Sequence, residues 1–453
     1  MALENDLGRD DIKKLVWRIA IPSMLAQFVS VLYSIVDRMY IGNIPDVGSV
    51  ALAGAGVCGP VVTMVGSVAF WVGIGGSPLM SMKMGQGDMK TAKKILANSF
   101  LLLAVASVLL VALIYPFREP MLRYFGASDT TYPYANTYFS IYLMGTFFAL
   151  MATGMNQFII SQGFAKTGMY SVIIGAVLNI VLDPVFIFAL HMGVAGAAVA
   201  TVLSQMASCA FVLSFLFGKK VPVKISFGGY DRKLIQRILL VGFTPFIIIA
   251  VDNVMIISNS VLQTYGGPGE GDMLITCATI VQSFMLVITM PLGGITGGTQ
   301  TILAFNYGAG QPDRVKKAQR FIFLLSAGYT TILFILAQTA GHLFVRLFTS
   351  DPALIAEAAK TIKIYTLAVI PLSIQYVIVD GFTGLGKVQL SLPLSFFRKL
   401  VYFLPLFLLP RFFGARATFY AEPISDIIAP VVSIFVYAVA MKRILKRPVI
   451  PNF

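Results

Sequence analysis

Long apolar runs alternate with short polar stretches along almost the whole chain. A helix needs about 20 residues to cross the hydrocarbon core of a bilayer. Twelve of the apolar runs reach that length, so we predict an all-α polytopic membrane protein with twelve transmembrane helices. The predicted spans are 15–40, 50–80, 93–115, 134–158, 168–190, 194–217, 236–264, 273–305, 318–345, 358–382, 389–410 and 420–444.

The overall composition strengthens this prediction. Hydrophobic residues make up 57% of the chain and charged residues only 12%, whereas ordinary soluble domains are about 25% charged. Cys58, Cys209 and Cys277 lie in apolar runs without pairing or metal-ligand spacing, so we expect them to pack. His191 and His342 have no ligand cluster around them. We therefore expect no cofactor and no metal other than a coupling ion.

The net charge of +14 is not spread evenly. Lys and Arg gather in alternate loops, and such a bias marks the cytoplasmic side of a membrane protein. We therefore predict that the chain crosses the cytoplasmic membrane with both termini inside the cell. The cations then set orientation and contact anionic lipid, and we expect no nucleic-acid partner. The basic loops are 13–14, 83–94, 219–237, 314–320 and 442–447, and the loops 43–49 and 266–272 hold no Lys or Arg.

An internal repeat divides the chain into halves. The string MGQG at 84–87, followed by Lys93 and Lys94, reappears as YGAG at 307–310, followed by Lys316 and Lys317. The same offset of 223 residues relates Pro22 to Pro245. Equal offsets over six spans indicate parallel repeats, which are known among transporters. The predicted parts are a cytoplasmic segment (1–14), an N-lobe (15–217), a cytoplasmic linker (218–235), a C-lobe (236–444) and a cytoplasmic tail (445–453).

One apolar run, 175–188, contains the two polar residues Asn179 and Asp183. An ionisable residue inside a membrane span is costly and indicates a functional site. Asn179 and Asp183 are four residues apart and share one face of a helix. Asp37 and Thr201 lie at a similar depth in their own spans, so we expect a common pocket. Oxygen ligands of this kind suit an alkali cation.

The same residues leave other interpretations open. A carboxyl group among apolar side chains could carry a proton instead of binding Na⁺. Asp183 could simply cap a kink at Pro184, and Asp37 could be neutralised by its neighbour Arg38. The sequence does not choose between Na⁺ and H⁺.

Four strings, at 36–42 (VDRMYIG), 179–188 (NIVLDPVFIF), 193–205 (GVAGAAVATVLSQ) and 297–318 (GGTQTILAFNYGAGQPDRVKKA), resemble the multidrug and toxic compound extrusion (MATE) family. The resemblance implies two six-helix lobes in a V around a central cavity. It also implies a monomer that exports small amphipathic cationic drugs in exchange for Na⁺ or H⁺. In that family the cation site lies in the N-lobe, and the matching positions are Asp37, Asn156, Asn179, Asp183 and Thr201.

The second half does not reproduce these acids, because the repeat offset takes Asp37 to Ser260. Arg398 and Asp426 are expected to form a buried polar pair. Asp252, near mid-membrane, is our candidate for holding a cationic drug. The resemblance places the eighth and tenth spans on the central cavity, although their side chains could equally pack or face lipid. The residues concerned are Gln282, Met285, Met290 and Tyr376.

Two strings match enzyme motifs, but neither lies in the context that its motif requires. The GxGxxG string at 54–59 follows no strand, so it does not indicate a nucleotide site. The GxGD string at 85–88 loses its acid in the repeat copy, where Gln311 replaces Asp88. We therefore expect a transporter and not an enzyme. A flippase for lipid-linked or other amphipathic precursors is the main alternative, and a channel is a more distant one.

Overall fold

The structure is a computed structural model that describes residues 5–251 and 254–446, without the side chains of 49, 248–251, 254–257, 268, 269 and 272. The described chain is helical throughout, which confirms the predicted fold class. The first half contains α1 (Ile12–Gly42), α2 (Gly48–Gly85), α3 (Met89–Ile114), α4 (Arg118–Tyr124), α5 (Tyr132–Met144), α6 (Thr146–Ile160), α7 (Ala165–Pro184), the π-helical η1 (Val185–Ala189) and α8 (Val194–Phe217). The second contains α9 (Arg232–Val251), α10 (Val254–Gly308), α11 (Pro312–Val345), α12 (Pro352–Tyr365), α13 (Val369–Gly384), α14 (Val388–Phe413), the 3-10 turn η2 (Ala415–Tyr420) and α15 (Ala421–Lys446).

These helices account for the twelve predicted spans. The fourth span is the bent pair α5 and α6, and the tenth is the bent pair α12 and α13. The predicted seventh span, 236–264, covers α9 and the first part of α10, and it includes residues 252 and 253, which lie outside the described residues. The backbone of α10 then turns at Gly267, where φ is +66°, and Met273–Gly308 forms the eighth span.

The repeat inferred from the sequence is also visible in the backbone. Gly87 and Gly310, which are 223 residues apart, both adopt a positive φ, of 78° and 67°. Gly163 and Gly386 share the same offset and have φ values of 91° and 68°. The bends in the fourth and tenth spans, of 57° and 48°, also fall at equivalent places. The duplication therefore extends over whole lobes and is not confined to one loop motif.

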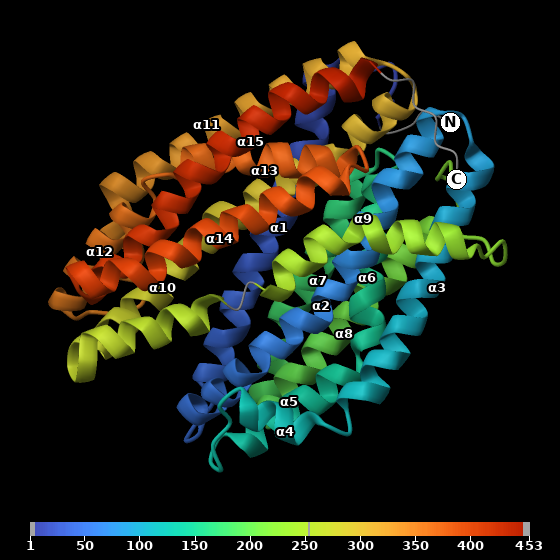
Figure 1. The fold of residues 1–453 in the computed structure, drawn as a ribbon. Helices are drawn as coiled ribbons and strands as arrows, with labels where there is room; N and C mark the ends of the chain where they lie inside the picture. The colour runs from blue at the N-terminus through green and yellow to red at the C-terminus, as the bar shows by residue number, and fades with distance from the viewer. Residues whose placement is uncertain (1–4, 252–253, 447–453) are drawn as a thin grey trace.

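The two lobes converge at one end of the molecule and diverge toward the other (Figure 1). The convergent end carries the start of α1, the turn between α2 and α3, and the end of α15. We call it the terminal end. Gly85 and Gly308 are repeat-related and meet the opposite lobe there at close range. A Cβ on Gly85 would collide with the Phe305 carbonyl oxygen, and one on Gly308 would collide with the Met82 carbonyl oxygen.

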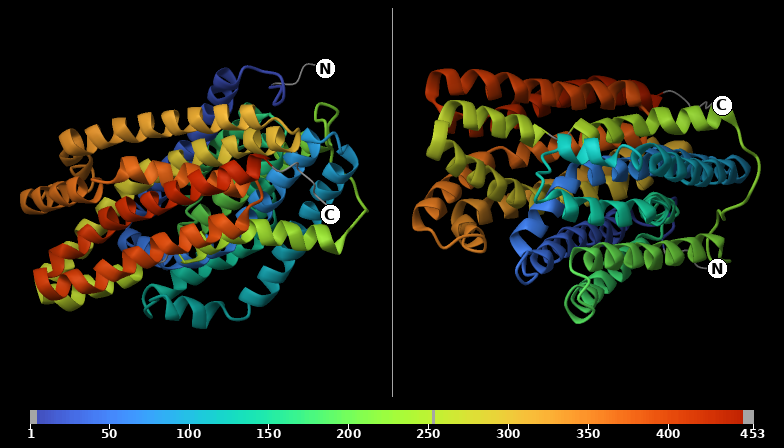
Figure 2. Two further views of the ribbon diagram at one scale, coloured as in Figure 1. Left: turned by 45° about the horizontal axis from the view of Figure 1, so that its top comes forward. Right: turned by 90° about the horizontal axis from the view of Figure 1, so that it is seen from below.

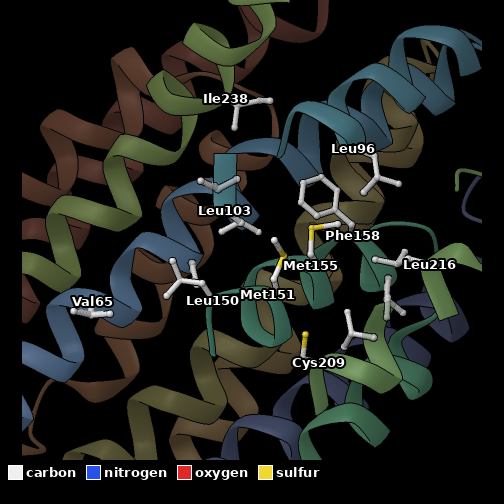
Figure 3. Packing of buried hydrophobic residues seen from close by; sticks show 14 of the residues in the cluster. Val65, Leu96, Leu103, Leu150, Met151, Met155, Phe158, Cys209, Leu216 and Ile238 are labelled. Carbon is white, nitrogen blue, oxygen red and sulfur yellow. The ribbon is translucent and has the colours of Figure 1, made fainter. Parts of the chain in front are cut away.

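The first helix of each half packs against the other half. α1 lies along α10, and α9 lies along α2 (Figure 2). Ile238 of α9 is fully buried in the apolar core of the first lobe, among side chains of α2, α3, α6 and α8 (Figure 3). Leu15 and Ile19 of α1 are likewise buried against α10 and α11 of the second lobe. The leading helices thus join the lobes: α9 packs mainly on α2 of the first lobe, and α1 packs both on α10 of the second lobe and on α7 of the first.

The remaining apolar surface is consistent with a lipid environment. Many large hydrophobic side chains are exposed on the outer faces of the helices, such as Val108 on α3 and Phe435 on α15. A water-soluble protein would not leave so much apolar surface uncovered. The three cysteines are buried and free, as predicted, and Cys209 packs in the first-lobe core (Figure 3).

Candidate functional site

The last turn of α7 presents the acid that the sequence singled out. Asp183 is 0% exposed and Asn179 is 2% exposed. Pro184 follows immediately, and the helix then widens into the π-helical segment η1. Proline lacks a backbone N–H and disturbs the helical ladder, and π-helical turns are frequent at functional sites. The local sequence thus places a buried carboxyl group beside an irregular segment of backbone.

Four of the five predicted N-lobe residues meet at this point. The Asn179 side-chain amide donates to Asp183 Oδ1 at 3.2 Å and to Thr201 Oγ1, on α8, at 3.4 Å. Asp37, on α1, reaches the same place, and its carboxyl group contacts that of Asp183. The helices α1, α7 and α8 therefore contribute oxygen atoms to one cluster, in which Asn179 and Asp183 are buried and Asp37 and Thr201 are half-buried. We call Asp37, Asn179, Asp183 and Thr201 the acid-pair cluster.

The charges in this cluster are not balanced by a cationic side chain. Asp37 Oδ1 and Asp183 Oδ2 are buried and accept no hydrogen bond from the described residues. Arg38 acts on Asp37 only through its charge, because its own side chain is exposed and no ion pair joins the two in the described part of the chain. Two carboxylates at such a short distance repel each other strongly unless a proton or a cation joins them. The geometry therefore suits reversible binding of one positive charge.

Aromatic hydroxyl groups surround the cluster, and the sequence analysis did not identify them. Tyr138, on α5, lies near Thr201 and Asp37. Tyr33 lies near Asp37 on α1, and Tyr142 lies near Gln205 of α8. Tyr138 and Tyr142 are four residues apart and their rings are stacked. The spacing of four residues within a tyrosine-rich segment is the sequence signal for these side chains.

The fifth predicted residue, Asn156, lies elsewhere. Its side-chain amide donates to the Gly168 carbonyl oxygen at 3.3 Å, near the beginning of α7. Gly168 precedes Asn179 by 11 residues, which corresponds to about 16 Å along a helix. Asn156 Oδ1 is buried without a hydrogen-bond donor among the described residues. The structure therefore does not bring Asn156 into the acid-pair cluster; it ties α6 to α7 closer to the terminal end.

The second lobe contains a different arrangement, in which an arginine joins two acids. Arg398 Nε donates to Asp426 Oδ1 at 2.8 Å, and Arg398 Nη2 donates to Glu422 Oε1 at 2.6 Å. The predicted contact of Arg398 with Asp426 is therefore present, and Glu422 is an additional partner. Lys399 also acts on Asp426 through its charge. Unlike the first-lobe acids, these acids form ion pairs with a basic side chain in direct contact.

The predicted cavity residues lie on the eighth and tenth spans, in varied surroundings. The Gln282 amide donates to the Tyr365 hydroxyl at 3.1 Å. Met285 is only 5% exposed and packs in the apolar core of the second lobe, whereas Met290 is half-buried. Tyr376 is half-buried and its hydroxyl lies near Arg398. Asp252 lies outside the described residues.

The ligand chemistry of the acid-pair cluster favours an alkali cation or a proton over a transition metal. Its donors are two carboxyl groups, an amide and a hydroxyl, and hard oxygen ligands of this kind suit hard cations. Within residues 5–251 and 254–446, no group of three or more His, Cys, Asp and Glu side chains is placed to hold a metal ion.

Comparison with known proteins gives a family match. The MatE family model matches residues 22–185 and 256–408. The matched residues make up most of the chain and include Asp37, Asn179 and Asp183, but not Thr201 or Asp426.

Curated relatives match over nearly their full length. The chain is 22% identical to multidrug export protein MepA of Staphylococcus haemolyticus, over 94% of this chain and 93% of that protein. It is 24% identical to an FAD transporter of Shewanella oneidensis, over 92% of both chains. A solved structure of the outward-facing conformation of a multidrug resistance MATE family transporter of the MOP superfamily has a TM-score of 0.90 and 22% identity. It covers 97% of this chain and 98% of that one.

Proposed function

Because the chain belongs to the MatE family, the multidrug and toxic compound extrusion transporters, we propose that it is a secondary active antiporter. It exports lipophilic, mostly cationic drugs and takes up Na⁺ or H⁺ in exchange. The observation that carries this proposal is the acid-pair cluster, where Asp37 and Asp183 meet without a basic partner at short range. A permanent ion pair would be structural, whereas an unbalanced pair can load and release a charge.

The orientation follows from the charge pattern. The basic turns after α2 and α10 lie at the terminal end, so we place this end in the cytoplasm. The protein then crosses the cytoplasmic membrane. The lobes then diverge toward the outside (Figure 1). The acid-pair cluster lies toward the outer ends of α1 and α7, where an external ion can reach it.

Transport follows from two ligands that prefer different conformations. Drug enters between the lobes when they are open to the cytoplasm, and the lobes then rock to open outward. An external cation or proton loads the acid pair and lowers its net negative charge by one, so α1 and α7 repack and the affinity for drug falls. Coupling requires that the ion and the drug favour different states, because a ligand that binds all states equally shifts nothing.

The membrane potential supplies enough energy for this exchange. Moving one charge across 100 mV contributes about 2.3 kcal/mol. If each cycle carries one net charge inward, this energy supports a roughly 50-fold drug gradient.

The substrate class rests on the relatives and on the charge of the spans. MepA proteins are multidrug export proteins by name, and the first-lobe site has an excess of acids. One relative of similar identity is an FAD transporter, so an anionic substrate is the alternative that an experiment must separate.

Dye binding to the purified protein tests the proposal. We expect an ethidium-like cation to bind and to be released by Na⁺ or by mild acid, with FAD as the anionic comparison. Release by Na⁺ identifies a sodium-coupled protein, and release only by acid identifies a proton-coupled one. Binding of FAD but not of the cation would contradict the proposed substrate class, and dye binding that neither Na⁺ nor acid changes would contradict the antiport.

A further inference from the structure

The segment before α1 bridges the two lobes at the terminal end, although the proposed transport cycle gives it no role. Residues 5–11 run across this end, and Asn5 and Leu7 are buried to 2% and 3% exposure. Such burial is unusual for a chain terminus, which is normally poorly ordered unless it is tied down. Contacts with both lobes hold the segment in place.

The contact with the first lobe is made by Asn5. Its side-chain amide donates to the Gly163 carbonyl oxygen, in the turn between α6 and α7, at 2.7 Å. Gly163 has a φ of 91°, and a Cβ at this position would lie 2.8 Å from the Asn5 backbone oxygen. The turn thus uses a glycine where the segment approaches it.

The contact with the second lobe is made by backbone oxygens of the segment. Asn306 Nδ2, at the end of α10, donates to the Leu7 carbonyl oxygen at 2.9 Å. Arg314 Nη2, on α11, donates to the carbonyl oxygens of Leu7 and Asp10 at 3.2 and 2.9 Å. Arg314 Nε also donates to Asn306 Oδ1 at 2.7 Å, which fixes the two donors relative to each other.

The linker between the lobes makes the equivalent contact for the second half, because the segment before α9 docks on the first half. Just before α9, the Asp231 backbone N–H donates to Asn98 Oδ1 of α3 at 3.0 Å. The segment before each leading helix therefore docks on the third span of the other half. The linker is covalently continuous with both lobes. Residues 5–11 are covalently connected only to α1 among the described residues, and their contacts with the turn at Gly163 and with α10 and α11 are non-covalent. They are the part of this arrangement that can detach.

We propose that residues 5–11 form a cytoplasmic latch that holds the lobes together while the transporter is open to the outside. Opening to the cytoplasm separates the turn at Gly163 from Asn306 and Arg314, so the segment must leave one of them. The second-lobe side has three hydrogen bonds, two of them from an arginine, and charged donors form stronger bonds. The bond between Asn5 and Gly163 is thus the one that breaks in each cycle.

A disulfide across the breaking contact tests whether release is required. A Cβ on Gly163 would lie 3.7 Å from Asn5 Cβ, within the usual range for a disulfide. The bridge requires a small shift of the segment, because the same Cβ would lie 2.8 Å from the Asn5 backbone oxygen. We expect N5C/G163C to lose at least 90% of drug efflux when oxidised and to recover it with reductant. The single variants N5C and G163C report any strain from the substitutions. The native cysteines are buried. Full efflux from completely cross-linked protein would overturn the proposal.

A distance measurement tests the latch independently of the exported compound. This inference rests on the alternating access of the proposed function, but spin labels at K93C and K316C report lobe separation whatever is transported. Both sites are exposed and are equivalent in the repeat. In the protein without substrate, R314A should increase the population with a long distance at least tenfold. R9A is the matched control, because the Arg9 side chain is exposed. Identical distance distributions for R314A and R9A would overturn the proposal.

Discussion

At the scale of single residues, the molecule shows why similar side chains have different tasks. Asp37 and the buried Asp183 meet beside an amide and a hydroxyl, whereas Asp426 is paired with Arg398. Ion pairs inside proteins are often structural, and removing one partner leaves an uncompensated charge. An acid pair without a basic partner is not locked into an ion pair, so it can bind and release a cation or a proton. The surroundings of the carboxyl group, and not its presence in a span, decide which acid can take part in coupling.

The Thr201 hydroxyl offers a residue-scale test of the acid-pair cluster. T201V keeps the shape of the side chain but removes an oxygen that interacts with Asn179 and Tyr138. Losing one hydrogen-bonding partner costs about 1 to 1.5 kcal/mol, so the ion concentration needed for half-maximal dye release should rise about 5- to 10-fold. T330V is the control, because the Thr330 hydroxyl bonds only to carbonyl oxygens of its own helix among the described residues. Equal ion dependence in both variants would count against Thr201 as a ligand.

At the scale of elements, the duplicated helices show which features the repeat preserves. Gly87 and Gly310 keep the same backbone turn, but the residues that follow differ. Asp88 caps α3 by accepting a hydrogen bond from the Thr91 backbone N–H at 3.0 Å. Gln311 occupies the equivalent position before α11 and makes no side-chain cap. The turn geometry is needed for the fold, whereas the cap is an individual contribution to stability.

These paired positions give a prediction about stability and pH. D88A should lower the free energy of unfolding by about 1 kcal/mol, because an N-cap is lost, while Q311A should have little effect. The hydrogen bonds from Thr91 hold the pKa of Asp88 below its ordinary value. The contribution of Asp88 is therefore fully present above pH 4 and disappears as the pH falls through the lowered pKa. Thermal unfolding of the detergent-solubilised protein at pH 7 and pH 3 measures both effects. An equal loss in D88A and Q311A would refute the capping role.

At the scale of the whole molecule, hydrophobic runs and the repeat were sufficient to predict the all-helical, twelve-span, two-lobe fold. They sufficed because each span needs its own apolar length and the duplication doubles the signal. Asn179, Asp183, Asp37 and Thr201 could be grouped from their depth along the spans. Asn156 has a similar polarity, but its partner, Gly168, is set by packing of α6 on α7. The packing of α1 and α9 against the opposite half and the role of residues 5–11 depend on contacts between the halves, which no local pattern encodes.

The central claim is that the pair of Asp37 and Asp183 carries the coupling ion, and dye efflux from proteoliposomes under an imposed Na⁺ or H⁺ gradient tests it most directly. D183N should fold and bind dye, but its efflux should no longer respond to either gradient. D380N removes another carboxyl group within a predicted span, which accepts a hydrogen bond from Thr296, and should retain the response. Gradient-driven efflux by D183N at the wild-type rate would contradict the account.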